Sequence, residues 1–290
     1  MESVNMYSVK KIEGSNLNEY LLSDESSNSS AKVAVGRGGI LTSYTVNGKE
    51  RIYLDADFYD ESEQKFRGGN PILFPSCGRL TDKVYTLNGK TYEMPNHGFV
   101  RDYAWQVAEI NENDAAELTI SVKSCAETLA MYPFEFEVRF TYRLKDGVLS
   151  IVQKVINNSD AGMPFALGLH PYFCADTSKA SVEVPSKLAY FFNDRVEFDG
   201  VLHATDDLDH VCVNLTGTKS VLDTGLGYSV EVTYEGKYAC VVVWSPMNNT
   251  QFVCVEPWSA APDALNTKEN LIYLAAGESE TFVMKFAVSE

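Results

Sequence analysis

Hydrophobic and polar residues alternate one by one over much of the chain. From Glu137 to Leu144 every second residue is apolar, and the same alternation runs over residues 118–123 and 282–288. A period of two places apolar side chains on one face of an extended strand and polar side chains on the other. The pattern therefore predicts half-buried antiparallel β-strands.

Turn residues separate these predicted strands. Asn47-Gly48 and Asn88-Gly89 each join two strand-like runs. Asparagine and glycine both tolerate the positive φ angles of a type I′ turn, so each pair is typical of a tight β-hairpin. Asp146-Gly147 is a further turn signal of this kind.

Helical patterning is weak in comparison. The best candidate is Ser124–Met131, where Ser124 and Glu127 have the spacing of a capping box and Pro133 stops the run. We see many short strands and no long linker or repeat. We therefore predict an all-β fold, a large antiparallel β-sandwich or barrel, in one domain over residues 1–290.

Composition narrows the class of protein. Hydrophobic residues make up 45% and charged residues 22% of the 290 residues, which is typical of a globular chain. Acidic residues (40) outnumber basic residues (24), so the formal charge is −16. A chain this acidic lacks the basic surface of a nucleic-acid or anionic-membrane binder, although a local basic pocket for a small anion remains open.

The sequence shows no membrane-spanning segment, secretory signal or paired-cysteine motif. No apolar run reaches the roughly 18 residues of a spanning helix. Residues 1–10 show no secretory signal. The six cysteines lie at least 14 residues apart at positions 77, 125, 174, 212, 240 and 254, without a Cys-x-x-Cys motif. We expect reduced thiols in a cytoplasmic protein.

Two ionisable residues precede prolines at the ends of apolar runs. His170 follows the run 165–169 and precedes Pro171, and Glu256 follows the run 252–255 and precedes Pro257. Proline restricts the preceding residue to an extended backbone, so we expect each residue to be held at the end of a strand. Such a position suits a side chain that must point reproducibly into a pocket. The alternative is structural: His170 as a buried core histidine and Glu256 as one member of a buried ion pair.

Other candidates lie near glycines. His97 occupies a turn-like stretch, Pro95 to Phe99. Arg67, Arg79 and Arg101 each lie in glycine-rich sequence, where the planar guanidinium often contacts a polar ligand. A surface or structural role is the alternative for each arginine.

Spacings typical of metal sites are missing. His203 and His210 are separated by acidic residues without zinc-ligand spacing. We therefore predict no metal and no cofactor.

Five segments, in order along the chain, together resemble the aldose 1-epimerase (galactose mutarotase-like) family. They are Phe66–Pro75, Asn96–Asp102, Tyr132–Phe136, Gly168–Phe173 and Cys254–Trp258. The resemblance implies a β-sandwich of the galactose mutarotase type, with a sugar pocket across one sheet. It also implies interconversion of the α and β anomers of a hexose without a cofactor.

Matching the motifs residue by residue assigns roles. Glu256 is similar to the family's general base, His170 to its general acid, and His97 to its second histidine near the ring oxygen. Arg79 resembles the arginine that contacts sugar hydroxyls, although Gly78 stands where galactose mutarotases carry asparagine. Asp209 resembles a sugar-binding aspartate.

The chemistry is consistent with these residue types. Mutarotation needs a base to take the proton of the anomeric hydroxyl and an acid to protonate the ring oxygen. A carboxylate suits the first step and an imidazole the second. Tyr172 and Trp258 lie near these residues in the motifs and could stack on a sugar face, with core packing as the alternative.

Alternatives for the substrate stay open. Arg67 and Arg101 resemble the hexose-6-phosphate 1-epimerase branch, whose arginines at such places meet the phosphate. A non-catalytic carbohydrate-binding protein on the same fold is a third possibility. In each case we expect a small sugar as the partner, no nucleic acid and no membrane, and the sequence leaves a homodimer open.

Overall fold

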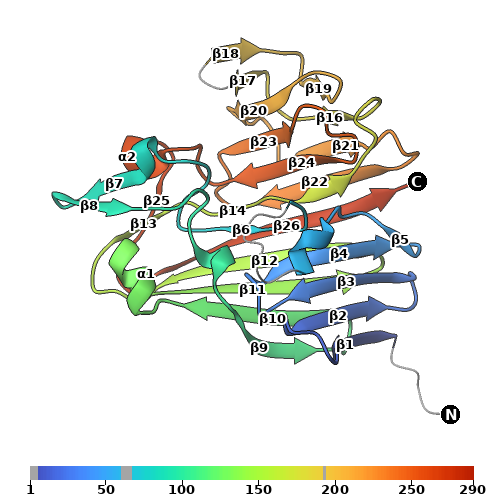
Figure 1. The fold of residues 1–290 in the computed structure, drawn as a ribbon, viewed down its shortest axis with the longest axis horizontal. Helices are drawn as coiled ribbons and strands as arrows, with labels where there is room; N and C mark the ends of the chain where they lie inside the picture. The colour runs from blue at the N-terminus through green and yellow to red at the C-terminus, as the bar shows by residue number, and fades with distance from the viewer. Residues whose placement is uncertain (1–5, 60–66, 192–193) are drawn as a thin grey trace.

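The computed structural model describes residues 6–59, 67–191 and 194–290, and β-strands dominate it (Figure 1). The described residues form two short α-helices, α1 (Ala126–Met131) and α2 (Ala264–Thr267), and 3₁₀ turns at Ala56–Tyr59, Thr81–Lys83 and Val100–Asp102. Among them, no helix combines the length and apolar character of a membrane span.

One layer of the molecule is a nine-stranded antiparallel sheet. Its order is β19 (Val201–His203), β16 (Ser181–Glu183), β21 (Lys219–Asp223), β22 (Ser229–Glu235), β26 (Ser279–Ser289), β12 (Val148–Asn157), β11 (Phe136–Lys145), β10 (Ala116–Lys123) and β9 (Gln106–Asn111).

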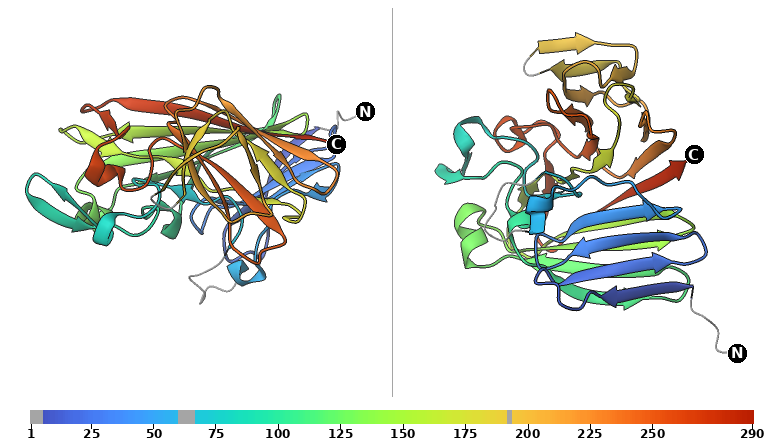
Figure 2. Two further views of the ribbon diagram at one scale, coloured as in Figure 1. Left: turned by 90° about the horizontal axis from the view of Figure 1, so that it is seen from above. Right: turned by 45° about the vertical axis from the view of Figure 1, so that its right-hand side comes forward.

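The opposite layer contains two sheets side by side (Figure 2). The first has the order β1 (Tyr7–Lys11), β2 (Glu19–Asp24), β3 (Ser29–Ala34), β4 (Ile40–Val46) and β5 (Lys49–Glu50). The second has the order β18 (Asp194–Glu197), β17 (Leu188–Phe191), β20 (Leu208–Val213), β23 (Cys240–Ser245), β24 (Phe252–Trp258), β14 (Gly168–Leu169) and β6 (Ile72–Leu73), while β15 (Tyr172–Cys174) also pairs with β24. Isolated bridges such as Ile52–Phe173 join the two sheets.

Two small ribbons complete the fold. β7 (Val84–Leu87) pairs with β8 (Lys90–Glu93), and β13 (Met163–Phe165) pairs with β25 (Ile272–Leu274).

A core of apolar side chains holds the two layers together. Phe286 on β26 contacts Tyr44 of the five-stranded sheet, with ring centroids 6.4 Å apart, and Phe173 of the eight-stranded sheet, at 5.0 Å. The main cluster of buried residues extends from Tyr7 to Phe286. The cluster includes residues from both layers, and the single domain over residues 1–290 stays a prediction.

The predicted strands and turns are present. The alternating segments coincide with β10, β11 and β26. Asn47-Gly48 joins β4 to β5 and Asn88-Gly89 joins β7 to β8, and all four residues have φ between 51° and 78°. The capping prediction for α1 was wrong by one residue, because the backbone N–H of Cys125, not Ser124, is bound by a side chain, Thr128 Oγ1, at 2.8 Å. All six cysteines are free thiols.

Candidate active site

The register of the eight-stranded sheet brings His170 and Glu256 together. β14 and β15 pair with the same strand, β24, in one common antiparallel register. Continued across the break between β14 and β15, this register places His170 directly opposite Glu256. Directly opposed residues point to the same face of a sheet. The Nδ1 atom of His170 lies 3.4 Å from Oε2 of Glu256.

The two prolines act differently from each other. β14 ends at Leu169, so His170 stands at its end, as its position before Pro171 predicts. The prediction that Glu256 ends its strand was wrong, because β24 continues through Pro257 to Trp258. A strand tolerates proline where the ladder to a neighbouring strand is interrupted, and the pairing of β24 with β14 and β15 is interrupted between Gly168 and Tyr172.

The sheet face that carries His170 and Glu256 continues over the neighbouring strands β23 and β20, where the register aligns two rows of side chains. Glu256 pairs with Val242 on β23, and Val242 with Val211 on β20. Two residues further along each strand, Asp209 pairs with Trp244. Because side chains alternate along a strand, both rows face the same side.

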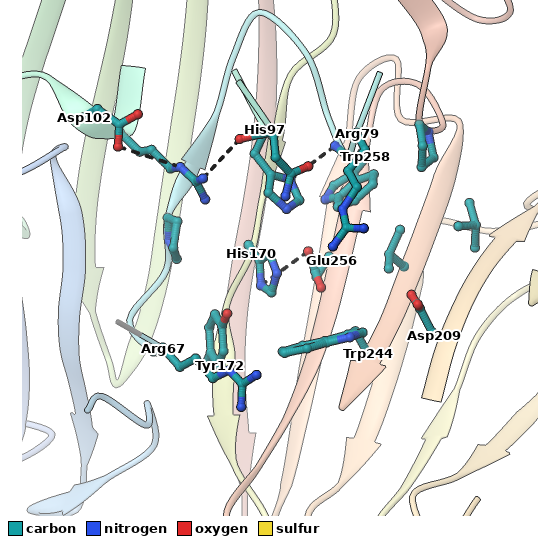
Figure 3. A pocket seen from close by; sticks show the side chains of 18 residues that line it. Arg67, Arg79, His97, Asp102, His170, Tyr172, Asp209, Trp244, Glu256 and Trp258 are labelled. Atoms are coloured by element: carbon teal, nitrogen blue, oxygen red, sulfur yellow. Dashed lines mark hydrogen bonds and ion pairs between the residues drawn. The ribbon is translucent and has the colours of Figure 1, made fainter. Parts of the chain in front are cut away.

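A cavity of about 680 Å³ lies over this face (Figure 3). This volume is in the usual range for small-molecule sites. Its lining contains all eight predicted site residues, Arg67, Arg79, His97, Arg101, His170, Asp209, Glu256 and Trp258, together with Gly68, Pro71, Gly78, Asn96, Asp102, Tyr172, Val211, Val242, Trp244 and Pro262. The structure therefore gathers these residues in one place, and their roles stay predictions. Phe66, which opens the first family segment, lies outside the described residues.

His170 and Glu256 form the floor of the cavity and are 9% and 1% exposed. Burial raises the pKa of Glu256 well above its usual value, and the Asp209 carboxylate adds to the rise. Burial lowers the pKa of His170 well below its usual value, and His97 adds to the fall. Both shifts favour a carboxylic acid beside a neutral imidazole over an ion pair.

Several polar atoms on this floor have no hydrogen-bond partner within the described protein. They are Nδ1 of His170, both carboxyl oxygens of Glu256 and Nε1 of Trp258. The Trp258 indole acts to lower the pKa of Glu256, although its N–H is not in hydrogen-bond geometry with either oxygen. Because buried polar atoms are normally paired, this concentration indicates a place for a polar ligand.

His97 reaches the cavity from a loop that a glycine holds against the sheet. Gly98 has a φ of +71°, and a Cβ there would lie 2.0 Å from the carbonyl oxygen of Phe74. This close approach lets Gly78 N–H donate to Nδ1 of His97 at 3.1 Å. Since Nδ1 accepts a hydrogen bond, the neutral ring carries its proton on Nε2.

The surroundings of His97 keep it neutral. Burial, followed by the positive charges of Arg101 and Arg79, lowers its pKa to about 3. The ring centroid lies 5.5 Å from that of His170 and 5.6 Å from that of Trp258. His97 therefore offers a fixed N–H donor close to the floor of the cavity.

The three arginines occupy different parts of the rim. Arg101 donates through Nη2 to the carbonyl oxygen of Asn96 at 3.0 Å, which fixes the turn that carries His97. The guanidinium of Arg67 lies 5.7 Å from the ring centroid of Trp244. In Figure 3, Arg67 lies beside Tyr172, and Arg79 lies beside Trp258.

The charges of the arginines reach different groups of the cavity. Burial raises the pKa of Tyr172, and the positive charges of Arg67 and Arg101 both oppose the rise. Arg79 acts on Asp209, whose pKa is raised by burial. Arg101 and Arg79 both act on His97, so the charge of Arg101 reaches both Tyr172 and His97.

One set of side chains within the described ranges could hold a metal ion. The ligand atoms of His170, Cys254 and Glu256 all lie within 4.8 Å of one another. Close spacing along the chain does not reveal this set, because its ligands come from two separate segments.

The sequence also missed a residue that only the register reveals. Trp244 and Tyr172 form an aromatic wall with ring centroids 6.0 Å apart, and His170 stacks on Tyr172 at 4.7 Å. Tyr172 stood inside a motif as a side chain that could stack on a sugar, whereas Trp244 had no motif to mark it. Knowledge of the pairing of β20, β23 and β24 would have placed Trp244 on the same face as Glu256.

Comparisons with known proteins identify the family of the chain. The solved structure of the Slr1438 protein from Synechocystis sp. PCC 6803 is 33% identical, with a TM-score of 0.89, covering 93% of this chain and 95% of that one. Protein LacX, chromosomal, from Lactococcus lactis subsp. lactis is 27% identical over 261 residues, 79% of this chain and 84% of its own.

A galactose mutarotase-like protein from Clostridium acetobutylicum shares the fold, with 17% identity, a TM-score of 0.82 and coverage of 98% and 99% of the two chains. The predicted antiparallel β-sandwich of the galactose mutarotase type is therefore confirmed. The family model described as Aldose 1-epimerase matches residues 20–287. The chain belongs to the aldose 1-epimerase family.

Proposed function

We propose that this protein interconverts the α and β anomers of a hexose by general acid–base catalysis. The observation that carries the proposal is the opposed pair His170 and Glu256 at the floor of the cavity, 3.4 Å apart and without hydrogen-bond partners among the described residues. No cofactor is part of the proposal.

The reaction needs two proton transfers close together. The pair shares one proton, and ring opening starts from the form that holds this proton on His170. The anomeric hydroxyl then loses its proton to the Glu256 carboxylate while His170 protonates the ring oxygen, and the C1–ring oxygen bond breaks as the aldehyde carbonyl forms. The open aldehyde turns about its C1–C2 bond, and the reverse transfers close the ring on the other face. Both reacting oxygens are bonded to C1, so acid and base must be neighbours, as His170 and Glu256 are.

Burial also suits a proton that must move in both directions. In water a histidine holds a proton more tightly than a glutamate does. Burial raises the pKa of Glu256 and lowers that of His170, which removes this preference. Because anomer exchange is reversible, each group must serve as acid in one direction and as base in the other.

The remaining lining binds and orients the sugar. His97 donates from Nε2 to a ring or hydroxyl oxygen, and Trp258, Trp244 and Tyr172 present aromatic surface to a pyranose face. Arg79 and Asp209 offer a donor and an acceptor for hydroxyl groups at the other end.

Nuclear magnetic resonance exchange spectroscopy on a panel of free and 6-phosphorylated aldoses tests the proposal. We expect the protein to accelerate exchange between the α and β anomers of at least one of them. Saturable binding of sugar without any acceleration would contradict catalysis and favour a non-catalytic carbohydrate-binding protein.

A second candidate substrate is a hexose 6-phosphate. Arg67 and Arg101 both line the cavity, and the positive charges of both oppose the rise in the pKa of Tyr172, so two cations are available there for a phosphate. If this is correct, Arg67→Ala or Arg101→Ala lowers kcat/KM for the phosphorylated sugar much more than for the free sugar. An equal effect on both sugars would remove the phosphate from the proposal.

A further inference from the structure

Cys254 lies next to the catalytic pair, and the proposed acid–base chemistry does not use it. It stands two residues before Glu256 on β24, so the two side chains share a face of the sheet. His170 is opposite Glu256 and diagonal to Cys254. All three residues are buried, at 9% exposure for His170, 0% for Cys254 and 1% for Glu256.

The spacing of the three ligand atoms suits a small metal ion. Ligand atoms around a tetrahedral zinc ion, with bonds of about 2.0–2.3 Å, lie about 3.3–3.8 Å apart. Nδ1 of His170 and Oε2 of Glu256 are 3.4 Å apart, and Sγ of Cys254 is within 4.8 Å of the ligand atoms of both. The three ligand atoms therefore lie close enough together for one ion to be placed among them.

A second, independent observation points to a ligand here. Nδ1 of His170 and both carboxyl oxygens of Glu256 have no hydrogen-bond partner in the described part of the chain. Tyr172 and Phe252 form an apolar cluster with Cys254 and exclude water from one side. A dry shell of this kind strengthens metal–ligand interactions.

We propose that His170, Cys254 and Glu256 form a binding site for a zinc-type divalent cation at the floor of the cavity. One imidazole nitrogen, one thiolate and one carboxylate make a donor set that suits Zn²⁺ better than Mg²⁺ or Ca²⁺. The fourth position faces the cavity, where water completes the coordination.

The site has a consequence for the proposed reaction. A bound cation occupies the lone pairs that would accept the sugar proton, so it blocks mutarotation. This consequence rests on the proposed function, whereas the metal site does not. Metal binding is therefore measured directly, so that failure of one proposal is distinguishable from failure of the other.

Titration of the metal-free protein with Co²⁺, followed by optical absorption, tests the site. Co²⁺ is a spectroscopic substitute for Zn²⁺. We expect one equivalent to bind with a near-ultraviolet thiolate-to-cobalt charge-transfer band, and we expect Zn²⁺ to displace it. Cys254→Ser should abolish the band, and His170→Asn should weaken binding by about tenfold or more.

Cys212→Ser is the matched control. Cys212 is also a buried strand cysteine of this sheet, but on β20 it alternates with Asp209 and Val211 and so faces away from the cavity. The charge-transfer band of the Cys212→Ser variant should be the same as that of the wild type. Absence of a charge-transfer band in the wild-type protein, or its survival in folded Cys254→Ser, overturns the proposal. If Cys254→Ser does not fold, the band's survival in His170→Asn with unchanged affinity overturns it equally.

Discussion

The neutral state of His97 predicts how stability depends on pH. Its ring is buried against Arg79 and Arg101, and Nδ1 already accepts the hydrogen bond from Gly78 N–H. A proton on Nδ1 would break that bond and add a positive charge near two others. In the unfolded chain the same ring takes up a proton freely near pH 6.5.

The effect of His97 on the free energy of unfolding follows from the difference in its proton binding between the folded and unfolded states. Above pH 6.5 the ring is neutral in both states, so His97 has no effect on the free energy of unfolding. As the pH falls below 6.5 the unfolded state binds the proton and the folded state does not, until the folded ring titrates at about 3. With about 1.4 kcal/mol for each pKa unit, His97 lowers the free energy of unfolding by about 2 kcal/mol at pH 5.

Urea denaturation of the wild type and His97→Gln between about pH 7.5 and pH 5 measures this term. Chelator in the buffer keeps metal ions away from His170. His97→Gln should lose about 2 kcal/mol less stability over this interval than the wild type. The reasoning is refuted if His97→Gln and the wild type lose the same stability.

Three further expectations concern packing, binding and catalysis. Gly78→Ala should lower the free energy of unfolding in urea by about 1–3 kcal/mol, since a Cβ there, at a φ of +72°, lies 2.8 Å from Cγ of Pro262; wild-type stability would contradict this contact. Trp244→Ala should raise KM and leave kcat nearly unchanged, because an aromatic wall binds substrate and transition state alike. The control Tyr190→Ala, at an exposed site of the same sheet, should change neither constant. A fall in kcat alone would contradict a binding role for Trp244. The His170–Glu256 pair works with one shared proton, so a second proton, taken up by His170 at low pH, should stop catalysis. Because burial lowers the pKa of His170, the acid limb of kcat/KM should lie below pH 6.5. An acid limb above pH 6.5 would contradict the neutral imidazole.

The strand pattern and turns could be predicted because they depend on local residues. Period-two alternation sets the two faces of β11 and β26, and Asn-Gly pairs fix the β4–β5 and β7–β8 turns. The pairing order of the strands could not be predicted in this way. β12 lies between β11 and β26, strands far apart in sequence, and only tertiary packing decides that neighbourhood.

The same distinction between local sequence and tertiary pairing applies to the residues of the candidate site. Residues with an unusual local setting, such as His170 before Pro171 and His97 beside Gly98, were found from the sequence and line the cavity. Trp244 and Cys254 lie in ordinary strand sequence and enter the site only through register. The proline after Glu256 was misread as a strand end, because sequence does not show that the neighbouring strand is interrupted there.

Anomer exchange by the Glu256→Gln and His170→Asn variants tests the central claim most directly. We predict that each change lowers the rate about 10²–10⁴-fold, and that the double change costs little more than the worse single change, since the pair acts as a unit. His210→Asn, one residue from Asp209 on β20 but on the opposite face of the sheet, should keep the wild-type rate. Full activity in either Glu256→Gln or His170→Asn would contradict the account.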